Sequence, residues 1–500
     1  MNTLVIFDVA ALLSALVLLF NLCKQEYRRR VGKEYSIRLP PGPSAIPIIG
    51  NVHQLPTEYQ EKTFFEWGRQ YGGIVYAKLF RNPAIVINSV EIARDLMERR
   101  SANYSDRPIF TLMEEMMGWI CMPTQMRYGE RYRKHRKWMQ DTFLSKSMLL
   151  SYQPIQRREM YIFLSSLSES PELFETHIRG FTAALLMEII YGHRVQSGTE
   201  DEYVELAERA ATKTVLAGSP GSGILSLLVD FFPVLKHYPL WLPGSGFKVK
   251  TNYIKGLVIR FLNVPYNMVK EQMTSGTAPP SFVATLLEKH RNESGLTEDD
   301  EDDIRGCAAS FYIAGTDTSG ATLTAFILSM VMNPEAFKKA QEEIDQVVGN
   351  DRLPDFEDRK SLPYMECVLK ELYRWDAAAV LGLPHRSMAE DVYQGYKIPR
   401  GSMIIPNIWG MSRDPVQYPN PEEFIPERFA DSSKSEADNY NPRNFVFGFG
   451  RRQCPGQLFA DGNIYLVMTS IIATMDISRE KDEYGHEIIP TPEFTSGLIR

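Results

Sequence analysis

One cysteine near the end of the chain stands in a sequence context suited to chemistry. Cys454 lies between a glycine-rich segment, residues 447–450, and a helix that Pro455 can open, because the first helical turn accommodates proline. Backbone N–H groups at a helix N-terminus and the nearby Arg452 favour a thiolate, so we expect a lowered pKa for this thiol. Such a cysteine is a metal ligand, a nucleophile or a packed core residue. No histidine lies nearby in the sequence to act as a base, which favours the ligand.

A second candidate lies in the middle of the longest predicted helix, residues 298–332, where the chain reads Ala-Gly-Thr-Asp-Thr. Thr318 can bond back to the carbonyl of Ala314, and the adjacent Gly315 helps to loosen the helical ladder there. Asp317 and Thr318 then form an acid–alcohol pair suited to proton delivery. The alternative is an ordinary helix contact made of small residues.

A third pattern is Glu371-Leu-Tyr-Arg374, in which an acid and a base three residues apart share one helix face. On its own this pattern is common. Together, however, these patterns resemble the cytochrome P-450 family. Its cysteine loop, Phe-x-x-Gly-x-Arg-x-Cys-x-Gly, is filled by Phe447, Gly450, Arg452, Cys454 and Gly456. The segment Phe424–Phe429 is similar to the family's Pro-Glu-Arg-Phe segment, and the motifs follow in the family's order.

The resemblance implies a role for each matching residue. Cys454 would be the thiolate ligand of the iron in haem b, and Arg452 would pair with a haem propionate. Asp317 and Thr318 would be the catalytic pair for oxygen activation. Glu371, Arg374 and Arg428 would form a buried charge triad.

The same resemblance implies further cofactor and substrate contacts. Cofactor contacts would come from Tyr132, where the family usually has tryptophan, and from Arg136, His385, Phe447 and Gly456. A lone histidine such as His385 is otherwise often a packing residue. Substrate contacts would come from Met117, Phe311, Ala314, Val380, Leu381 and Ser496. The methionines of residues 113–126 suggest an adaptable apolar lid, with plain core packing as the alternative.

The N-terminus is predicted to be a membrane anchor. From Leu4 to Leu22 the chain is apolar except at three positions, which is long enough to cross the ~30 Å hydrocarbon core. The cations follow this span, so the positive-inside rule places the rest of the chain in the cytoplasm, at the endoplasmic reticulum membrane. A cleaved signal peptide is the alternative. We therefore expect an anchor at residues 1–23, a basic and proline-rich linker at 24–43 and one catalytic domain at 44–500.

Composition and periodicity are those of one large globular domain. The 500 residues carry a net charge of −7, which argues against a protein that binds nucleic acid through overall basicity. We expect the P-450 fold, mainly α with a smaller β-rich region. The predicted helices are 128–144, 180–191, 201–216, 253–273 and 298–332, and the predicted strands are 73–79, 84–87, 392–397 and 402–406. The acidic run at residues 298–303 suits a helix N-terminus capped by Thr297 better than a metal site.

These expectations define a monooxygenase that inserts one oxygen atom of O2 into an apolar small molecule, of the terpene, polyketide or alkaloid type. No dinucleotide fingerprint is present, so the resemblance implies an NADPH-dependent flavoprotein reductase as partner, with cytochrome b5 as a second electron donor. A basic helix is its candidate docking site, through Arg127, Arg131, Arg133, Lys134, Arg136 and Lys137, unless this is only a solvated face. The alternatives are a haem-thiolate isomerase or dehydratase and a non-catalytic haem sensor. Family members usually continue through another short strand pair after this point, and whether the C-terminus is truncated stays open.

Overall fold

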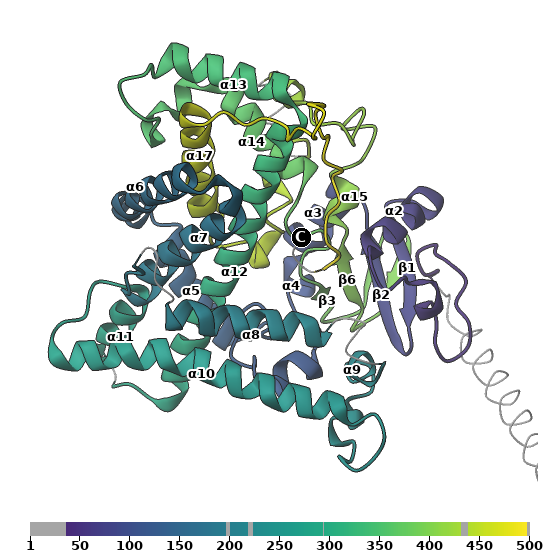
Figure 1. The fold of residues 1–500 in the computed structure, drawn as a ribbon. Helices are drawn as coiled ribbons and strands as arrows, with labels where there is room; N and C mark the ends of the chain where they lie inside the picture. The colour runs from purple at the N-terminus through teal and green to yellow at the C-terminus, as the bar shows by residue number, and fades with distance from the viewer. Residues whose placement is uncertain (1–36, 197–200, 219–223, 294, 432–438, 498–500) are drawn as a thin grey trace, which may run out of the picture.

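The computed structural model describes residues 37–196, 201–218, 224–293, 295–431 and 439–497. A large assembly of helices forms one side of the molecule, and a small sheet with its short helices forms the other (Figure 1). This is the mainly α architecture with a smaller β-rich region that the sequence predicts. The predicted anchor at residues 1–23 lies outside the described residues, as does the linker up to residue 36. Within the described ranges, no helix is both long and apolar enough to cross a membrane.

The longest helix, α12, runs through the helical side over Glu298–Met332, as predicted. The Thr297 hydroxyl accepts a hydrogen bond from the Asp300 backbone N–H, and the Asp300 carboxylate accepts one from the Thr297 N–H. This capping box satisfies backbone donors that a helix start leaves unpaired. The helix ends at Met332 and is followed by the capping residue Asn333 and by Pro334, which begins the next helix.

The remaining helices surround α12 or connect the helical side to the sheet. Those of eight or more residues are α2 (Gln60–Tyr71), α5 (Glu130–Phe143), α6 (Lys146–Glu169), α7 (Phe174–Tyr191), α8 (Glu202–Gly218), α10 (Gly246–Ser275), α11 (Phe282–Glu293), α13 (Pro334–Val347), α14 (Pro363–Trp375) and α17 (Gln457–Thr474). The shorter ones are α3 (Val90–Arg94), α4 (Ser101–Tyr104), α9 (Ile224–Leu228) and α15 (Ile408–Met411). Helices α7 and α10 each begin about two turns before the predicted start. Their first turns are largely polar or exposed, so they lack the apolar period that marks a helix in sequence.

The main sheet has the strand order β1-β2-β6-β3, formed by β1 (Ile74–Leu79), β2 (Asn82–Ile87), β6 (Met403–Pro406) and β3 (His385–Arg386). Strand β2 pairs antiparallel with β1 and parallel with β6, which brings residues far apart in sequence together. The prediction of one strand over 392–397 is wrong. That segment is a hairpin of β4 (Asp391–Tyr393) and β5 (Tyr396–Ile398), whose turn residues Gln394 and Gly395 both have positive φ.

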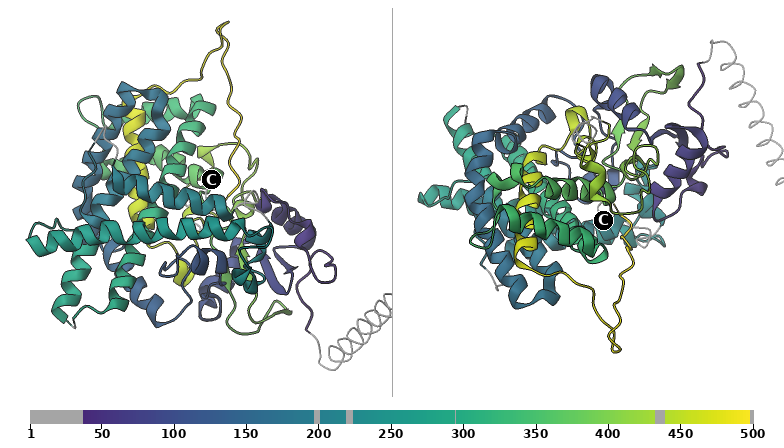
Figure 2. Two further views of the ribbon diagram at one scale, coloured as in Figure 1. Left: turned by 60° about the horizontal axis from the view of Figure 1, so that its bottom comes forward. Right: turned by 90° about the horizontal axis from the view of Figure 1, so that it is seen from above.

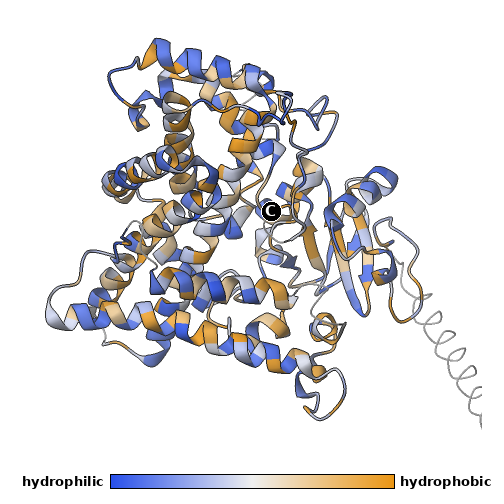
Figure 3. Ribbon diagram, in the orientation of Figure 1, coloured by the Kyte–Doolittle hydropathy of each residue, from blue (hydrophilic) through white to orange (hydrophobic). Residues whose placement is uncertain are grey.

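The core follows this division into two sides. One cluster of buried apolar side chains fills the helical side, and two smaller clusters lie on the two opposite faces of the sheet. Helix α17 is apolar around its circumference and buried, whereas α10 alternates apolar and polar faces at the surface (Figure 3). After α17 the chain leaves the body as a long irregular loop (Figure 2).

Candidate active site

The cysteine segment connects η9, a short 3₁₀ turn at Pro442–Asn444, to α17. Within it the Cys454 N–H donates to the Phe447 carbonyl at 2.8 Å, which closes the loop on itself. Gly450 has a φ of 55°, and a Cβ there would lie 2.2 Å from the Met97 carbonyl oxygen. Only glycine allows this backbone approach. The glycine of the motif is therefore needed to seat the loop against the π-helical turn η2 (Asp95–Arg99).

The Cys454 thiol differs from the sequence expectation in its electrostatics. Burial raises its pKa, and the Gly456 N–H and the Arg136 charge offset that only in part. The expected lowering by Arg452 is wrong, because the Arg452 guanidinium donates instead to the backbone carbonyls of Ser105, Pro123 and Met126. A buried thiol of this kind becomes a thiolate when a metal binds it, since coordination itself removes the proton. The environment fits a ligand better than a free nucleophile.

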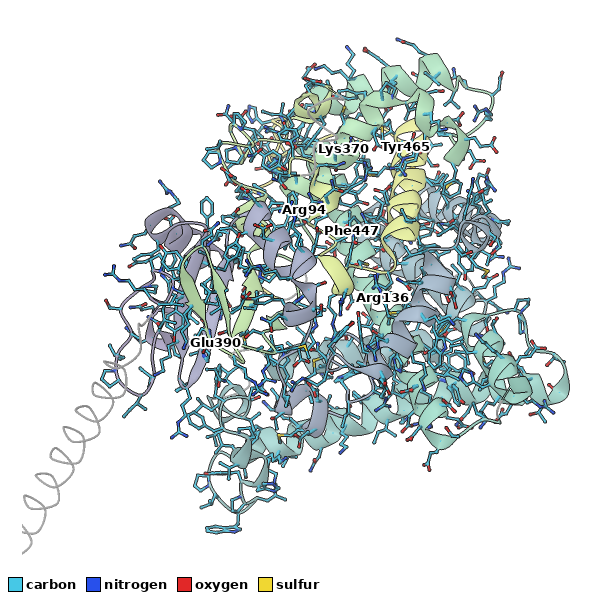
Figure 4. All side chains as sticks on the ribbon, turned by 180° about the vertical axis from the view of Figure 1, so that it is seen from behind. Arg94, Arg136, Lys370, Glu390, Phe447 and Tyr465 are labelled. Atoms are coloured by element: carbon cyan, nitrogen blue, oxygen red, sulfur yellow. The ribbon has the colours of Figure 1, made fainter. Side chains whose placement is uncertain are left out.

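Helix α5 holds the loop from the side. The Tyr132 hydroxyl donates to the Arg451 carbonyl at 2.9 Å, and Arg136 donates to the Gln453 carbonyl at 2.6 Å. In the view of Figure 4, Arg136 and Phe447 both lie below Tyr465, which α17 carries. Two residues predicted as cofactor contacts thus touch the backbone of the segment that leads directly into Cys454.

Basic side chains are buried beside the loop without carboxylate partners. Arg107 donates to the carbonyls of Thr124, Leu383 and Pro384, and Arg452 also donates only to carbonyls. Among the described residues neither arginine forms an ion pair. Burial, with the charge of Arg452, lowers the pKa of Arg107 to about 9, so it still carries its charge at neutral pH.

The imidazole of His385 lies with these arginines. Its Nδ1 is 2.7 Å from the Tyr104 carbonyl oxygen, and burial followed by repulsion from Arg107 holds its pKa well below the ordinary value. Uncompensated buried charges of one sign are costly. The two carboxylates of a haem would supply the missing counter-charges, so this donor set fits the cofactor. Sequence reasoning missed Arg107, which belongs to no quoted motif.

The middle of α12 carries the acid–alcohol pair as expected. The Thr318 hydroxyl donates to the Ala314 carbonyl at 2.7 Å. Ala314 and Asp317 are accessible to water, whereas the turns before and after them are buried. Although water reaches the Asp317 side chain, the surrounding helices reduce its hydration, and this desolvation, followed by repulsion from Glu208, raises the pKa of its carboxyl to about 6. A carboxyl with this pKa can both accept and donate a proton near neutral pH.

The structure brings the three charged residues of the predicted triad together. Arg374 donates from Nε and Nη2 to the two Glu371 oxygens, both at 2.8 Å, and Arg428 Nε donates to Glu371 at 3.1 Å. Glu371 and Arg374 are fully buried. Arg374 also donates to the carbonyls of Ser412, Pro421 and Glu423, so the triad fastens this irregular segment to α14.

The six predicted substrate contacts do not share one environment. Met117 and Val380 are buried, and Met117 belongs to the core of the helical side, which is the packing alternative. Phe311 packs edge-on against Phe143 and Phe282, with ring centroids 4.7 and 5.1 Å away.

The other three lie at partly accessible places. Ala314 faces the accessible turn of α12, and Leu381 is half-buried beside the sheet. Ser496 is exposed, and its hydroxyl accepts a hydrogen bond from the Tyr59 N–H at 2.9 Å. In this structure only Ala314 lies beside the acid–alcohol pair in the chain and shares its accessible turn.

The acidic run at the start of α12 does more than suit the helix dipole. Asp303 is buried and pairs with Arg131, Lys134 and His135 of α5, with a separation of 2.9 Å to His135 Nε2. Asp300 pairs with Lys134 at 3.0 Å. Helices α5 and α12 are therefore joined by one charged cluster. From the sequence, its acidic residues were assigned to a helix cap and its basic residues to a docking surface.

The cysteine loop, the charge triad and the Thr318–Ala314 contact in α12 are together typical of a haem-thiolate enzyme, and the comparison with known proteins agrees. The chain belongs to the cytochrome P450 family, whose model matches residues 40–495.

Similar proteins come from fungi. Cytochrome P450 monooxygenases 176 and 136 of Postia placenta are 45% and 44% identical, each over 92% of this chain, and the matches cover 88% and 86% of those proteins. Cytochrome P450 monooxygenase claR of Ampulloclitocybe clavipes is 40% identical over 92% of this chain and 84% of its own length. The chain is thus a P450-type monooxygenase, and its family implies haem as the cofactor.

Proposed function

We propose that Cys454 binds the haem iron and that the enzyme oxidises an apolar small molecule, of the terpene, polyketide or alkaloid type, with O2 and two electrons from a separate NADPH-dependent reductase. Haem supplies the oxygen chemistry when it is bound. The chain's own residues seat the cofactor and deliver protons. The observation that carries the proposal is the Thr318–Ala314 hydrogen bond beside Asp317, because it places an alcohol next to a titratable carboxyl at an accessible turn of α12. An isomerase, a dehydratase or a haem sensor would not need this pair.

Replacing Thr318 with alanine tests this role. The variant should bind haem and substrate like the parent protein, yet it should divert most of its electrons to hydrogen peroxide, because proton delivery fails. The measurement is the ratio of product to NADPH consumed. Thr322→Ala is a matched control, since Thr322 makes the same backbone bond to Thr318 one turn later. An unchanged ratio in Thr318→Ala would remove the threonine from the mechanism.

The electron donor should dock on the exposed part of α5 and on the cysteine loop. Arg133, Lys137 and Arg451 are exposed there, and Leu458 at the start of α17 adds an exposed apolar side chain. Arg131 and Lys134 were candidates from the sequence, but they pair with Asp303 and belong to the α5–α12 cluster. Opposite charges raise association rates, and the effect weakens with salt because the Debye length falls from ~10 Å at 0.1 M to ~3 Å at 1 M.

Changing Arg133 and Lys137 to glutamate should therefore slow reductase-driven turnover and flatten its salt dependence. Turnover driven by added peroxide should stay the same, because it needs no docking. Lys338→Glu on α13 is the control, since its side chain is 69% exposed and that of Arg133 is 60% exposed. If both kinds of turnover fell together, Arg133 and Lys137 would be needed for the haem site or for folding. The electron donor would then have to dock on another surface.

The membrane should meet the surface where the described chain begins. Ile48 lies in a turn whose Ile49 carbonyl accepts a hydrogen bond from the Phe80 N–H, and the Phe80 ring contacts Phe231 and Phe232. The segment that follows exposes Val234, Leu240 and Trp241. These apolar side chains form a surface next to the entry of the chain, and a lipid bilayer reached by the predicted anchor would cover it.

A polarity-sensitive fluorescent dye can be attached to the cysteine of a Trp241→Cys variant of the full chain. When phosphatidylcholine vesicles are added, its emission should shift toward that of an apolar environment. Val416→Cys is the matched control, because Val416 is 84% exposed and Trp241 is 81% exposed. Val416 does not belong to the apolar surface. Its signal should not change. Equal signals at the two sites would show that the surface stays in water.

A further inference from the structure

Four charged side chains form a closed ring on the side of α14 that faces the cysteine loop. They are Arg359 of η7 (Phe356–Ser361), Glu366 of α14, Arg443 of η9 and Asp461 of α17. Arg359 and Arg443 each donate to an oxygen of Asp461 at 2.6 Å. Both arginines also donate to Glu366, from Arg359 at 3.1 Å. Each carboxylate thus binds both guanidinium groups.

The ring is neutral overall, with Arg443 and Asp461 mostly buried and Arg359 and Glu366 partly exposed. Burial alone would raise the pKa of the Asp461 carboxyl, but the charges of Arg443 and Arg359 outweigh it and hold that pKa below its ordinary value. The arginines also stack on aromatic rings, Arg359 on Tyr465 at 4.8 Å and Arg443 on Tyr373 at 5.9 Å. A partly buried, charge-assisted network of this kind fixes relative positions far better than a surface ion pair does.

The ring spans the two ends of the cysteine segment. Arg443 precedes the loop and Asp461 follows it, so their ion pair closes the loop at its base. A second connection runs inside the first: Gln457 donates to the Arg443 carbonyl at 3.1 Å, and Gln453 donates to Gln457 at 2.9 Å. The residue next to Cys454 is thereby tied to the ring. The Glu371 triad has no member in this network.

We propose that Arg443 and Asp461 are positioning residues that hold the base of the loop closed and so keep the Cys454 sulfur in place as the thiolate ligand. The inference rests on the proposed ligand role of Cys454. Removing the Arg443–Asp461 pair lets the two ends of the loop separate, and the sulfur then spends more time away from the iron, where it takes up a proton.

The test compares Asp461→Asn with Glu188→Gln in the haem-loaded full chain. Glu188 pairs with Arg158 between α6 and α7, away from the loop. It is a matched control because its side chain is 19% exposed and that of Asp461 is 12% exposed. Both variants should lower the urea midpoint. In the reduced, carbon monoxide-bound protein, the thiolate spectrum slowly gives way to the neutral-thiol spectrum. Asp461→Asn should make this conversion about 10-fold faster than in the parent protein, the size of effect typical for residues that support a metal ligand. Glu188→Gln should leave the rate unchanged.

A second variant separates positioning from stability. Asp461→Asn leaves Arg359 and Arg443 facing the single carboxylate of Glu366. Adding Arg359→Gln removes the excess positive charge, while the ion pair between Arg443 and residue 461 stays broken. The double variant should recover stability but keep the rapid spectral conversion. Equal conversion rates in the parent, Asp461→Asn and Glu188→Gln proteins would overturn the proposal, as would full spectral recovery in the double variant.

Hydrogen exchange of the backbone amides of residues 445–456 is a measurement that does not depend on which residue binds the iron. Exchange of these amides should quicken in Asp461→Asn and stay at the parent rate in Glu188→Gln. If the parent protein itself lacked the thiolate spectrum, the ligand role of Cys454 would fail, and the exchange rates would still decide whether the ring holds the loop. Unchanged exchange in Asp461→Asn would overturn the positioning role.

Discussion

Cys454→Ala should abolish the thiolate spectrum of the reduced, carbon monoxide-bound protein and reduce monooxygenase turnover to background. The sulfur lies in a loop held by the Phe447 carbonyl and by α5, and no other described cysteine lies within a glycine-rich turn. The other described cysteines, Cys121, Cys307 and Cys367, are all buried in the core, so none can replace it. Loss of the sulfur therefore removes the only available thiolate donor in the described part of the chain.

Two further variants sharpen this result. Cys454→His should keep haem in the pocket but give the spectrum of a neutral nitrogen ligand, because imidazole coordinates iron without a negative charge. Cys367→Ala, which removes a buried sulfur elsewhere, should keep the parent spectrum. A thiolate spectrum that survives in Cys454→Ala would assign the iron to another residue.

Glu371→Gln should give the largest loss of stability among single substitutions in the charge triad. Two arginines would lose their shared carboxylate at a site where Glu371 and Arg374 are fully buried. Breaking a buried pair costs about 3–5 kcal/mol because the surviving charge has no partner. Whole domains are stable by only about 5–15 kcal/mol, so most of the protein should fail to fold with haem.

The measurements are haem content per chain and the urea midpoint. Glu427→Gln is the control within the same segment, because Glu427 pairs with Lys339 at the surface, where an ion pair contributes about 0–1 kcal/mol. It should match the parent protein in both measurements. Equal haem content and midpoints in Glu371→Gln and the parent would show that the arginines are satisfied by carbonyls alone.

The sequence predicted features whose cause is local. The limits of α12 follow from Thr297 and Pro334, and the Thr318–Ala314 bond follows from helical spacing, so neither needs tertiary information. The hairpin at β4 and β5 was missed although its signal was local, because a residue with positive φ precedes Gly395 and glutamine seldom marks such a turn.

Features that depend on tertiary neighbours could not be predicted. Burial raises the pKa of Cys454, and Arg452 does not offset this because it turns toward carbonyls of residues 105–126, although sequence adjacency suggested that it would. Arg131 and Lys134 looked like part of a docking surface until the start of α12 was placed beside them. In each case the sequence gives the charge of a side chain, but the fold decides which partner it meets.

Arg107, Arg452 and His385 lie together without forming an ion pair among the described residues, and this has a consequence for how the protein is made in a cell. Until haem arrives, the newly synthesised chain holds two like charges close together in its interior. A ligand that binds only the folded state stabilises it by about 2.7 kcal/mol at a concentration of 100 times its Kd. The yield of folded enzyme from a producing host should therefore follow the host's capacity to synthesise haem, so that a haem precursor in the growth medium raises the yield more than a lower growth temperature does.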